Sequence, residues 1–167
     1  MRRLLISVAV ILAIVAAYSF FAGGSERAVR DRIQALAELL SAPAGEEPLA
    51  RASRFASLRV HLAPGIRVEL PGEGISLQGT DEVSGFALRA AVPAAGILVE
   101  TGGIDVEIQP DRETADARFS ARILERRPDS EPWLLDARTV ALTLVRHDRT
   151  WRISSARIMP SDDTGGR

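Results

Sequence analysis

Alternation of apolar and polar residues in the second half of the chain constrains its fold most strongly. The alternation covers three long stretches, residues 97–109, 115–126 and 133–145, and a last one at about 150–159. A period of two residues is typical of a β-strand with one buried face. The connections are short and carry Pro, Asp and Ser, which favour turns. This half therefore predicts consecutive long strands, paired antiparallel.

The stretch 133–145 alternates imperfectly. Asp136 and Arg138 have the same parity as the apolar residues Val140, Leu142 and Leu144: all five stand at even-numbered positions and would point to the same face of a regular strand. A β-bulge would produce this pattern, and so would a strand that leaves one packing partner for another. The sequence leaves both explanations open.

The first half of the chain has helical spacing instead. Residues 25–40 predict a helix capped by Ser25, with an apolar stripe of Val29, Ile33, Leu36 and Leu40. Residues 48–57 predict a second helix that begins at Pro48, with Leu49, Ala52, Phe55 and Ala56 on its inner side.

Residues 59–79 alternate around Pro-Gly turns and predict two or three short strands. A third helix follows, capped by Thr80 and ending near Pro93. Its predicted inner face consists of Val83, Phe86, Ala87 and Ala90.

A charge-free run, Leu4–Ala22, follows Arg2 and Arg3 at the N-terminus. A helix of this length spans about 28 Å, close to the hydrocarbon thickness of a bilayer. The two arginines should remain cytoplasmic, which places the rest of the chain on the extracytoplasmic side. The alternative is a signal peptide cleaved after Ala17. Either interpretation exports the domain.

These elements predict an α+β chain with an N-terminal transmembrane helix and then three helices packed on a strongly curved, mainly antiparallel sheet. We expect residues 1–24 to form the anchor or signal, residues 25–160 to form one domain, and residues 161–167 to form a disordered tail.

Two segments carry a family resemblance. "GTDEVSGFALRAA" (79–91) looks like a glycine-led third helix, and "VALTLVRHDRTWRISSARI" (140–158) looks like a final hairpin. With the order of the elements, they resemble the cone-shaped superfamily of nuclear transport factor 2, which includes the polyketide cyclase SnoaL-like proteins. The resemblance covers about residues 26–159 and implies a cystatin-like cone with a cavity. It implies no catalytic residue, because this superfamily hosts enzymes, binders and scaffolds.

Candidate acid–base groups are few. Enzymes of the superfamily typically use Asp, His and Tyr in the cavity, and the only tyrosine here, Tyr18, lies in the predicted anchor. The parity of His61 predicts that it points away from the core. His147 and Asp148 are predicted at the tip of a turn, where little would hold a general base in place.

Three charged residues give the sharper enzymatic hypothesis. Asp105, Arg118 and Asp136 lie on successive predicted strands and would form an Asp–Arg–Asp site, as in epoxide hydrolases of the same fold, if they faced the cavity. We favour the alternative, a set of cross-strand ion pairs on the outer face of the sheet.

Apolar residues are predicted to point into the space between helices and sheet. They are the ligand-pocket candidates Phe55, Phe86, Val106, Phe119, Leu142 and Trp151. The simpler interpretation is a filled core, and the alternative is a pocket for a small apolar ligand.

Composition excludes several classes of function. The chain lacks cysteine, which removes disulfides, thiolate nucleophiles and Cys-ligated metals. Two separated histidines do not form a metal-ligand set, so no metal and no cofactor are predicted. The formal net charge of −1 and the few aromatic residues argue against nucleic-acid binding.

The sequence thus predicts a single-pass protein of the cytoplasmic (inner) membrane, held in the lipid bilayer by Leu4–Ala22, with a periplasmic domain. Its layout is similar to that of anchored domains in type IV secretion assembly factors and mycobacterial lipid-importer accessory proteins. This favours a non-catalytic interaction module, with a homodimer or an envelope protein as partner on the sheet face. The alternative is a small apolar-ligand binding protein or a cavity enzyme (isomerase, dehydratase or epoxide-hydrolase-like) on the same fold.

Overall fold

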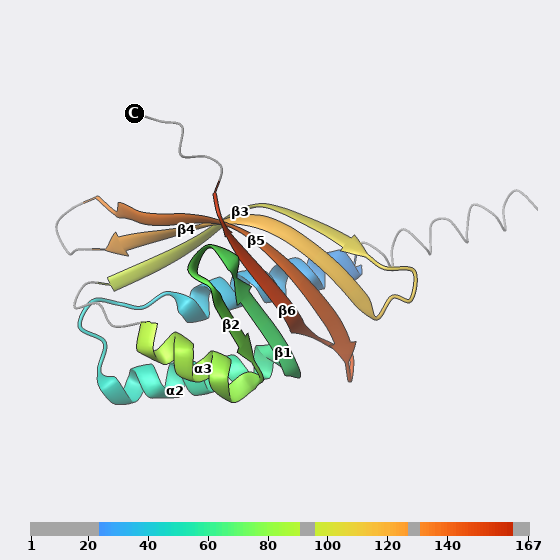
Figure 1. Cartoon of the computed structure of the whole chain (residues 1–167), viewed down its shortest axis with the longest axis horizontal. Coiled ribbons are helices and arrows are strands. Elements are labelled where there is room, and N and C mark those ends of the chain that lie inside the picture. Colours follow the sequence, from blue (N-terminus) through green and yellow to red (C-terminus); the bar gives the residue numbers. More distant parts are fainter. Residues whose placement is uncertain (1–23, 91–95, 127–130, 162–167) are drawn as a thin grey trace, which may run out of the picture.

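The computed structural model describes residues 24–90, 96–126 and 131–161, which form three helices and six strands (Figure 1). The helices are residues 24–40, called the N-terminal helix below, α2 (Pro48–Leu58) and α3 (Thr80–Ala90). Two 3₁₀ turns, η1 (Arg59–His61) and η2 (Pro71–Glu73), flank the first strand. The strands are β1 (Leu62–Leu70), β2 (Ile75–Gln78), β3 (Gly96–Ile108), β4 (Thr114–Arg126), β5 (Trp133–His147) and β6 (Thr150–Pro160).

The strands form one mixed sheet in the order β2-β1-β6-β5-β4-β3. The pair β1–β6 is parallel, and the other pairs are antiparallel. All three helices lie on the same side of this sheet (Figure 1). The prediction of an α+β chain with three helices on a mainly antiparallel, cone-like sheet is therefore confirmed. The predicted transmembrane helix and the segment 162–167 of the predicted tail lie outside the described residues.

Bulges curve the long strands around the helices. The register shifts by one residue at Gly103 in β3, at Leu135 in β5 and at Ser154 in β6. Gly103 has a φ of 61°, which costs glycine little. Each extra residue bends its strand and increases the local twist. The bulge at Leu135 precedes Asp136, so it does not explain the imperfect pattern of β5: Asp136, Arg138 and Val140 all lie on the inner face.

The N-terminal helix packs its predicted stripe against the sheet, with Val29 and Ile33 fully buried. Its helical residues already include Gly24, so Ser25 lies inside the helix and the prediction of Ser25 as N-cap is wrong.

Helix α2 begins at Pro48 as predicted, but its inner face differs from the prediction. Phe55 and Leu58 are buried, whereas Leu49 is 82% exposed and Ala52 and Ala56 are also exposed. The helix is rotated because two arginines three residues apart, described next, occupy the side that faces the preceding loop.

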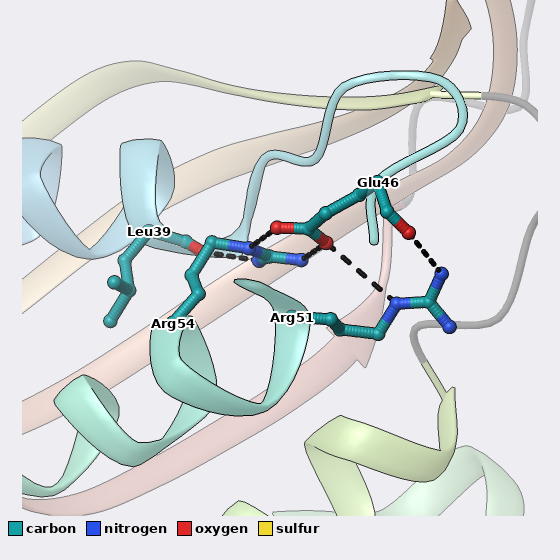
Figure 2. Close-up of polar contacts among 4 residues, drawn as sticks. All are labelled: Leu39, Glu46, Arg51 and Arg54. Carbon is teal, nitrogen blue, oxygen red and sulfur yellow. Dashed lines mark hydrogen bonds and ion pairs between the residues drawn. The ribbon is translucent and has the colours of Figure 1, made fainter. Parts of the chain in front are cut away.

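A buried carboxylate joins α2 to the N-terminal helix (Figure 2). Arg54 donates from Nε and Nη2 to the two oxygens of Glu46, at 2.8 and 2.7 Å, and from Nη1 to the carbonyl of Leu39 at 2.5 Å. Arg51 adds a contact to Glu46 Oε2 at 3.7 Å. The side chain of Glu46 is only 8% exposed, and the hydrogen bonds from Arg54 lower its pKa. This Glu46 cluster (Glu46, Arg51 and Arg54) also satisfies a carbonyl in the last turn of the N-terminal helix.

Residues 59–79 fold much as predicted, into the two short strands β1 and β2. His61 is an exception, because it lies in η1 and its imidazole is partly buried instead of pointing away from the core. Arg32 Nη1 donates to His61 Nδ1 across 3.1 Å. Burial is the main cause that lowers the pKa of His61, and the charge of Arg32 lowers it further.

No helix in the described ranges is long and apolar enough to span a membrane. The run Leu4–Ala22, for which the anchor is predicted, belongs to the residues that the structure does not describe.

Candidate functional site

An apolar cavity of about 290 Å³ lies between the inner face of the sheet and the helices. Its walls come from all three helices and all six strands of the described residues, with α2 contributing only Leu58. The apolar side chains that line it include Leu36, Leu40, Ile66, Leu70, Leu77, Val83, Phe86, Val99, Phe119, Ile123, Val140, Leu142 and Ile158. Cavities of about 300 Å³ and more with such walls are typical of small-molecule sites.

Three of the six predicted pocket residues line this cavity, namely Phe86, Phe119 and Leu142. Phe55 is instead a fully packed core residue at 3% exposure. Val106 and Trp151 are also buried, but they lie beside the start of the N-terminal helix, next to Gly24 and Ser25. The cavity thus occupies only one end of the inner face, which strand parity alone does not specify.

Arg138 is the one charged residue among those that line the cavity. It donates from Nε to Asp136 Oδ2 and from Nη2 to Glu73 Oε1, both at 2.7 Å. The hydrogen bond to Asp136 is the main cause that raises the pKa of Arg138, so the guanidinium stays charged. The ion pair with Glu73 joins β5 to η2 across this end of the cavity.

Arg138 faces inward because no bulge separates it from Val140, so the two side chains lie on the same face of β5. After the bulge, Asp136 pairs with Ile123 and Arg138 pairs with Ala121, both on the inner face of β4. Arg138 is not among the predicted pocket residues, although the parity that it shares with Val140 indicates its inward orientation. Glu73 carries no such signal, because η2 brings it to Arg138 only through the fold.

The predicted Asp–Arg–Asp site does not assemble. Asp105 and Arg118 are direct cross-strand partners, and both are exposed on the outer face. Asp136 lies on the inner face, since it pairs with Ile123 and not with an outer residue. The interpretation as outer-face charges is correct for Asp105 and Arg118, and that for Asp136 is wrong because Asp136 keeps the parity of the inward-facing Val140.

Comparisons with known proteins agree on the architecture. The search found no matching family model and no matching curated protein. Among solved structures, a protein of Novosphingobium aromaticivorans described as NTF2-like with a cystatin-like fold has a TM-score of 0.69 at 15% identity, covering 89% of this chain and 90% of its own. The fold is NTF2-like.

Two further structures carry names of enzymes. A candidate dehydratase of the NTF2-like family from Streptomyces avermitilis has a TM-score of 0.65 at 16% identity, covering 84% of this chain and 98% of its own. A candidate scytalone dehydratase from Novosphingobium aromaticivorans has a TM-score of 0.63 at 13% identity, covering 84% and 88%. Identities this low show the shared NTF2-like fold alone.

The lining of this NTF2-like cavity offers little for acid–base catalysis. The described residues that line it include no Asp, Glu, His or Tyr, and the single ionised group is a guanidinium held by two carboxylates. His61 is bonded to Arg32 outside the lining. His147 lies where predicted, at the β5–β6 turn, and its imidazole is 66% exposed and 3.3 Å from Asp148. The described residues also contain no group of three or more His, Cys, Asp or Glu side chains placed to hold a metal ion.

The outer face of the sheet carries charges in two neighbouring rows. One row runs from β1 to β3 through Glu69, Arg157, Ala141, Arg118 and Asp105. The next row contains Arg67, Ser155, Thr143, Asp116 and Glu107. These ten residues are called the outer charged rows below. Arg157 donates to Glu69 at 2.7 Å, and Thr143 donates to Asp116 at 2.8 Å, so the rows are partly fixed by their own contacts.

Proposed function

We propose that the chain binds a small apolar molecule in the cavity of its NTF2-like domain without transforming it. The observation that carries the proposal is the cavity itself, whose lining is apolar apart from Arg138 and Thr101. Binding of an apolar ligand in an apolar cavity is favourable because the ligand replaces water that makes few hydrogen bonds there. The absence of Asp, Glu, His and Tyr from the described lining favours binding over acid–base chemistry.

Naphthalene tests this proposal, because it is apolar and its size, about ten non-hydrogen atoms, matches a space of about ten water volumes. We expect saturable binding by isothermal titration calorimetry and a rise in melting temperature with ligand concentration. Ala87→Leu should weaken binding at least tenfold, because Ala87 lines the cavity on α3.

The matched control is Ala56→Leu, the same substitution on an exposed position of α2. It should leave naphthalene binding unchanged. If naphthalene does not bind, or if both variants bind it equally well, the proposal is wrong. Turnover of a bound compound would instead support the enzymatic alternative.

A second function rests on the outer charged rows, and we propose that they form a homodimer interface. If two copies face each other with a two-fold axis running along the strands between β5 and β6, β1 of one copy lies opposite β4 of the other. Arg67 then faces the second copy's Asp116, and Glu69 faces its Arg118. Both pairs have opposite charges, so the rows are self-complementary in this arrangement.

Charge exchange tests the homodimer. Variant one combines Arg67→Glu with Glu69→Arg, and variant two combines Asp116→Arg with Arg118→Asp. Each variant alone should be monomeric in sedimentation velocity, because each places like charges opposite one another. A mixture of the two should form a heterodimer, because every pair is restored. A monomeric mixture, or a monomeric unmodified chain, would remove this function and leave an envelope protein partner as the alternative for this face.

We also propose that Leu4–Ala22 anchors the protein in the cytoplasmic membrane, with the NTF2-like domain on the periplasmic side. The charge-free run after Arg2 and Arg3 supports this placement. Mass spectrometry of the mature protein tests it. An intact N-terminus in the membrane fraction is expected, and a terminus at Tyr18 would contradict the anchor in favour of a cleaved signal.

A further inference from the structure

The polar groups of the cavity lie side by side on the inner face of three neighbouring strands. Arg138 of β5 pairs with Ala121 of β4, and Ala121 pairs in turn with Thr101 of β3. All three residues line the cavity. Alanine is the smallest side chain in this row, so it leaves space between the guanidinium on one side and the hydroxyl on the other. The Thr101 hydroxyl has no hydrogen-bond partner within the described part of the chain.

The charge at this end of the cavity disfavours an anion. Arg138 contributes one positive charge, while Asp136 and Glu73 contribute two negative charges at 2.7 Å from its nitrogens. A ligand carboxylate beside Arg138 would be the third carboxylate around one guanidinium. Repulsion between like charges is strong where water is partly excluded. A neutral group avoids this repulsion and can still bond to Arg138.

We infer that the ligand is a neutral apolar alcohol whose hydroxyl lies over Ala121, between Arg138 and Thr101. The hydroxyl oxygen accepts a hydrogen bond from the guanidinium, and its proton is donated to Thr101 Oγ1, which has a free acceptor position. The hydrocarbon part fills the apolar space toward Phe119 and Leu142. This inference rests on the proposed ligand-binding function and names the class of ligand.

The choice between octan-1-ol and octanoate tests the inference, because the two have the same number of carbon atoms and differ in the polar end. Dissociation constants are measured for the full chain in detergent at pH 7.5, by calorimetry and by displacement of naphthalene. We expect octan-1-ol to bind at least tenfold more tightly than octanoate. Equal or tighter binding of octanoate would overturn the inference even if naphthalene binds. Failure of naphthalene itself would instead overturn the proposed function.

Two variants separate the hydroxyl contact from general packing. Thr101→Val keeps the shape of the side chain but removes its hydroxyl, and should weaken octan-1-ol binding about three- to tenfold with naphthalene binding unchanged. The matched control is Thr139→Val, on the outer face of β5 opposite Ser120, which should change neither. If Thr101→Val weakens the binding of octan-1-ol and naphthalene equally, Thr101 contributes only to packing, and its predicted hydrogen bond to the ligand is wrong.

Glu73→Gln tests the electrostatic part of the inference. The substitution removes one negative charge near Arg138 while it keeps a hydrogen-bond acceptor for Nη2. Octanoate should then bind more tightly by about fivefold or more, and octan-1-ol should change little, so the ratio between them narrows. An unchanged ratio would show that charge does not select the ligand, and the inference would be wrong.

Discussion

The two faces of the sheet are made by the same strands, yet they differ in the chemistry of their side chains and in how deeply these are buried. On the inner face, Ala115, Leu144 and Ile153 are almost completely buried under the helices. On the outer face, charged residues in the same strands, such as Asp105, Asp116 and Arg118, are exposed. Alternate residues of a strand point to opposite faces, so a single step of register exchanges one environment for the other.

This difference determines where function can reside in the molecule. The inner face is mostly apolar, and the one charged residue among the described residues that line the cavity, Arg138, is held by the carboxylates of Asp136 and Glu73. The outer face is exposed, so its charges are available for recognition.

Truncation of a buried inner-face residue should destabilise the domain most. Leu144→Ala removes a side chain with 0% exposure and should lower the free energy of unfolding by about 3 kcal/mol through lost burial and a cavity. Ser155→Ala, on the outer face of the adjacent strand, should change it by less than about 0.5 kcal/mol. Urea denaturation followed by circular dichroism measures both values. Similar losses for the two variants would mean that the faces are not energetically distinct.

Removal of the buried carboxylate in the helical layer should have the next largest effect. Glu46→Gln leaves the guanidinium of Arg54 without its ionised partner and should cost about 2–3 kcal/mol. The exposed pair Arg59–Asp81, with side chains 58% and 82% exposed, provides the control. Asp81→Asn should cost less than about 1 kcal/mol.

The same carboxylate should make stability depend on pH. The pKa of Glu46 is lowered in the folded state, mainly by the hydrogen bonds from Arg54. The resulting stabilisation is fully present above the ordinary glutamate pKa of 4.5 and is lost as the pH falls through the folded-state pKa. The difference between the unmodified chain and Glu46→Gln should therefore shrink in acid. If the difference in stability between the two proteins stays constant as the pH falls, Glu46 is not the source of this pH dependence.

Most of the fold could be predicted from the sequence because its signals are local and repeated. The alternation of apolar and polar residues in 97–109 and 115–126 predicts which side chains are buried. Val106 and Phe119 are buried in the structure, as this pattern predicts. The location of the cavity could not be predicted in the same way. The alternating pattern places Val106, Trp151 and Phe119 on the same face of the sheet. Which of them lines the cavity depends on the curvature of the sheet, which the pattern does not specify.

The polar end of the cavity is a second feature that could be predicted from the sequence only in part. The parity of Arg138 was visible in the sequence, whereas its partner Glu73 lies far away along the chain and joins it only when η2 packs beside β6. There the Cβ of a residue at Gly72 would lie 3.3 Å from Pro160. Long-range pairs of this kind leave no periodic signal. The Glu46 cluster was also missed, since Glu46 lies in the loop before α2 and follows no helical or strand period.

The β5–β6 turn should respond to substitution with a small gain in stability. Asp148 and Arg149 have φ values of 49° and 63°, which is the left-handed conformation of a tight hairpin turn. Arg149→Gly removes the unfavourable contact of the Cβ in this conformation and should stabilise the domain by about 0.5–1 kcal/mol. Arg152→Gly, within β6, should destabilise it. A stabilised turn would support the view that this hairpin sets the register, and therefore the faces, of the two strands.

The smallest expected effect concerns His61, at the boundary between the N-terminal helix and the sheet. Its pKa is lowered in the folded state, mainly by burial and further by Arg32, so the unfolded chain takes up the proton first as the pH falls below the ordinary value of 6.5. Stability should therefore decrease with acidification in this range. His61→Gln should make the decrease shallower between about pH 7 and 5. Arg32→Gln should do so only in part, because burial remains. If the two variants and the unmodified chain have the same profile, His61 does not contribute, and the acid sensitivity of the helical layer depends on Glu46 alone.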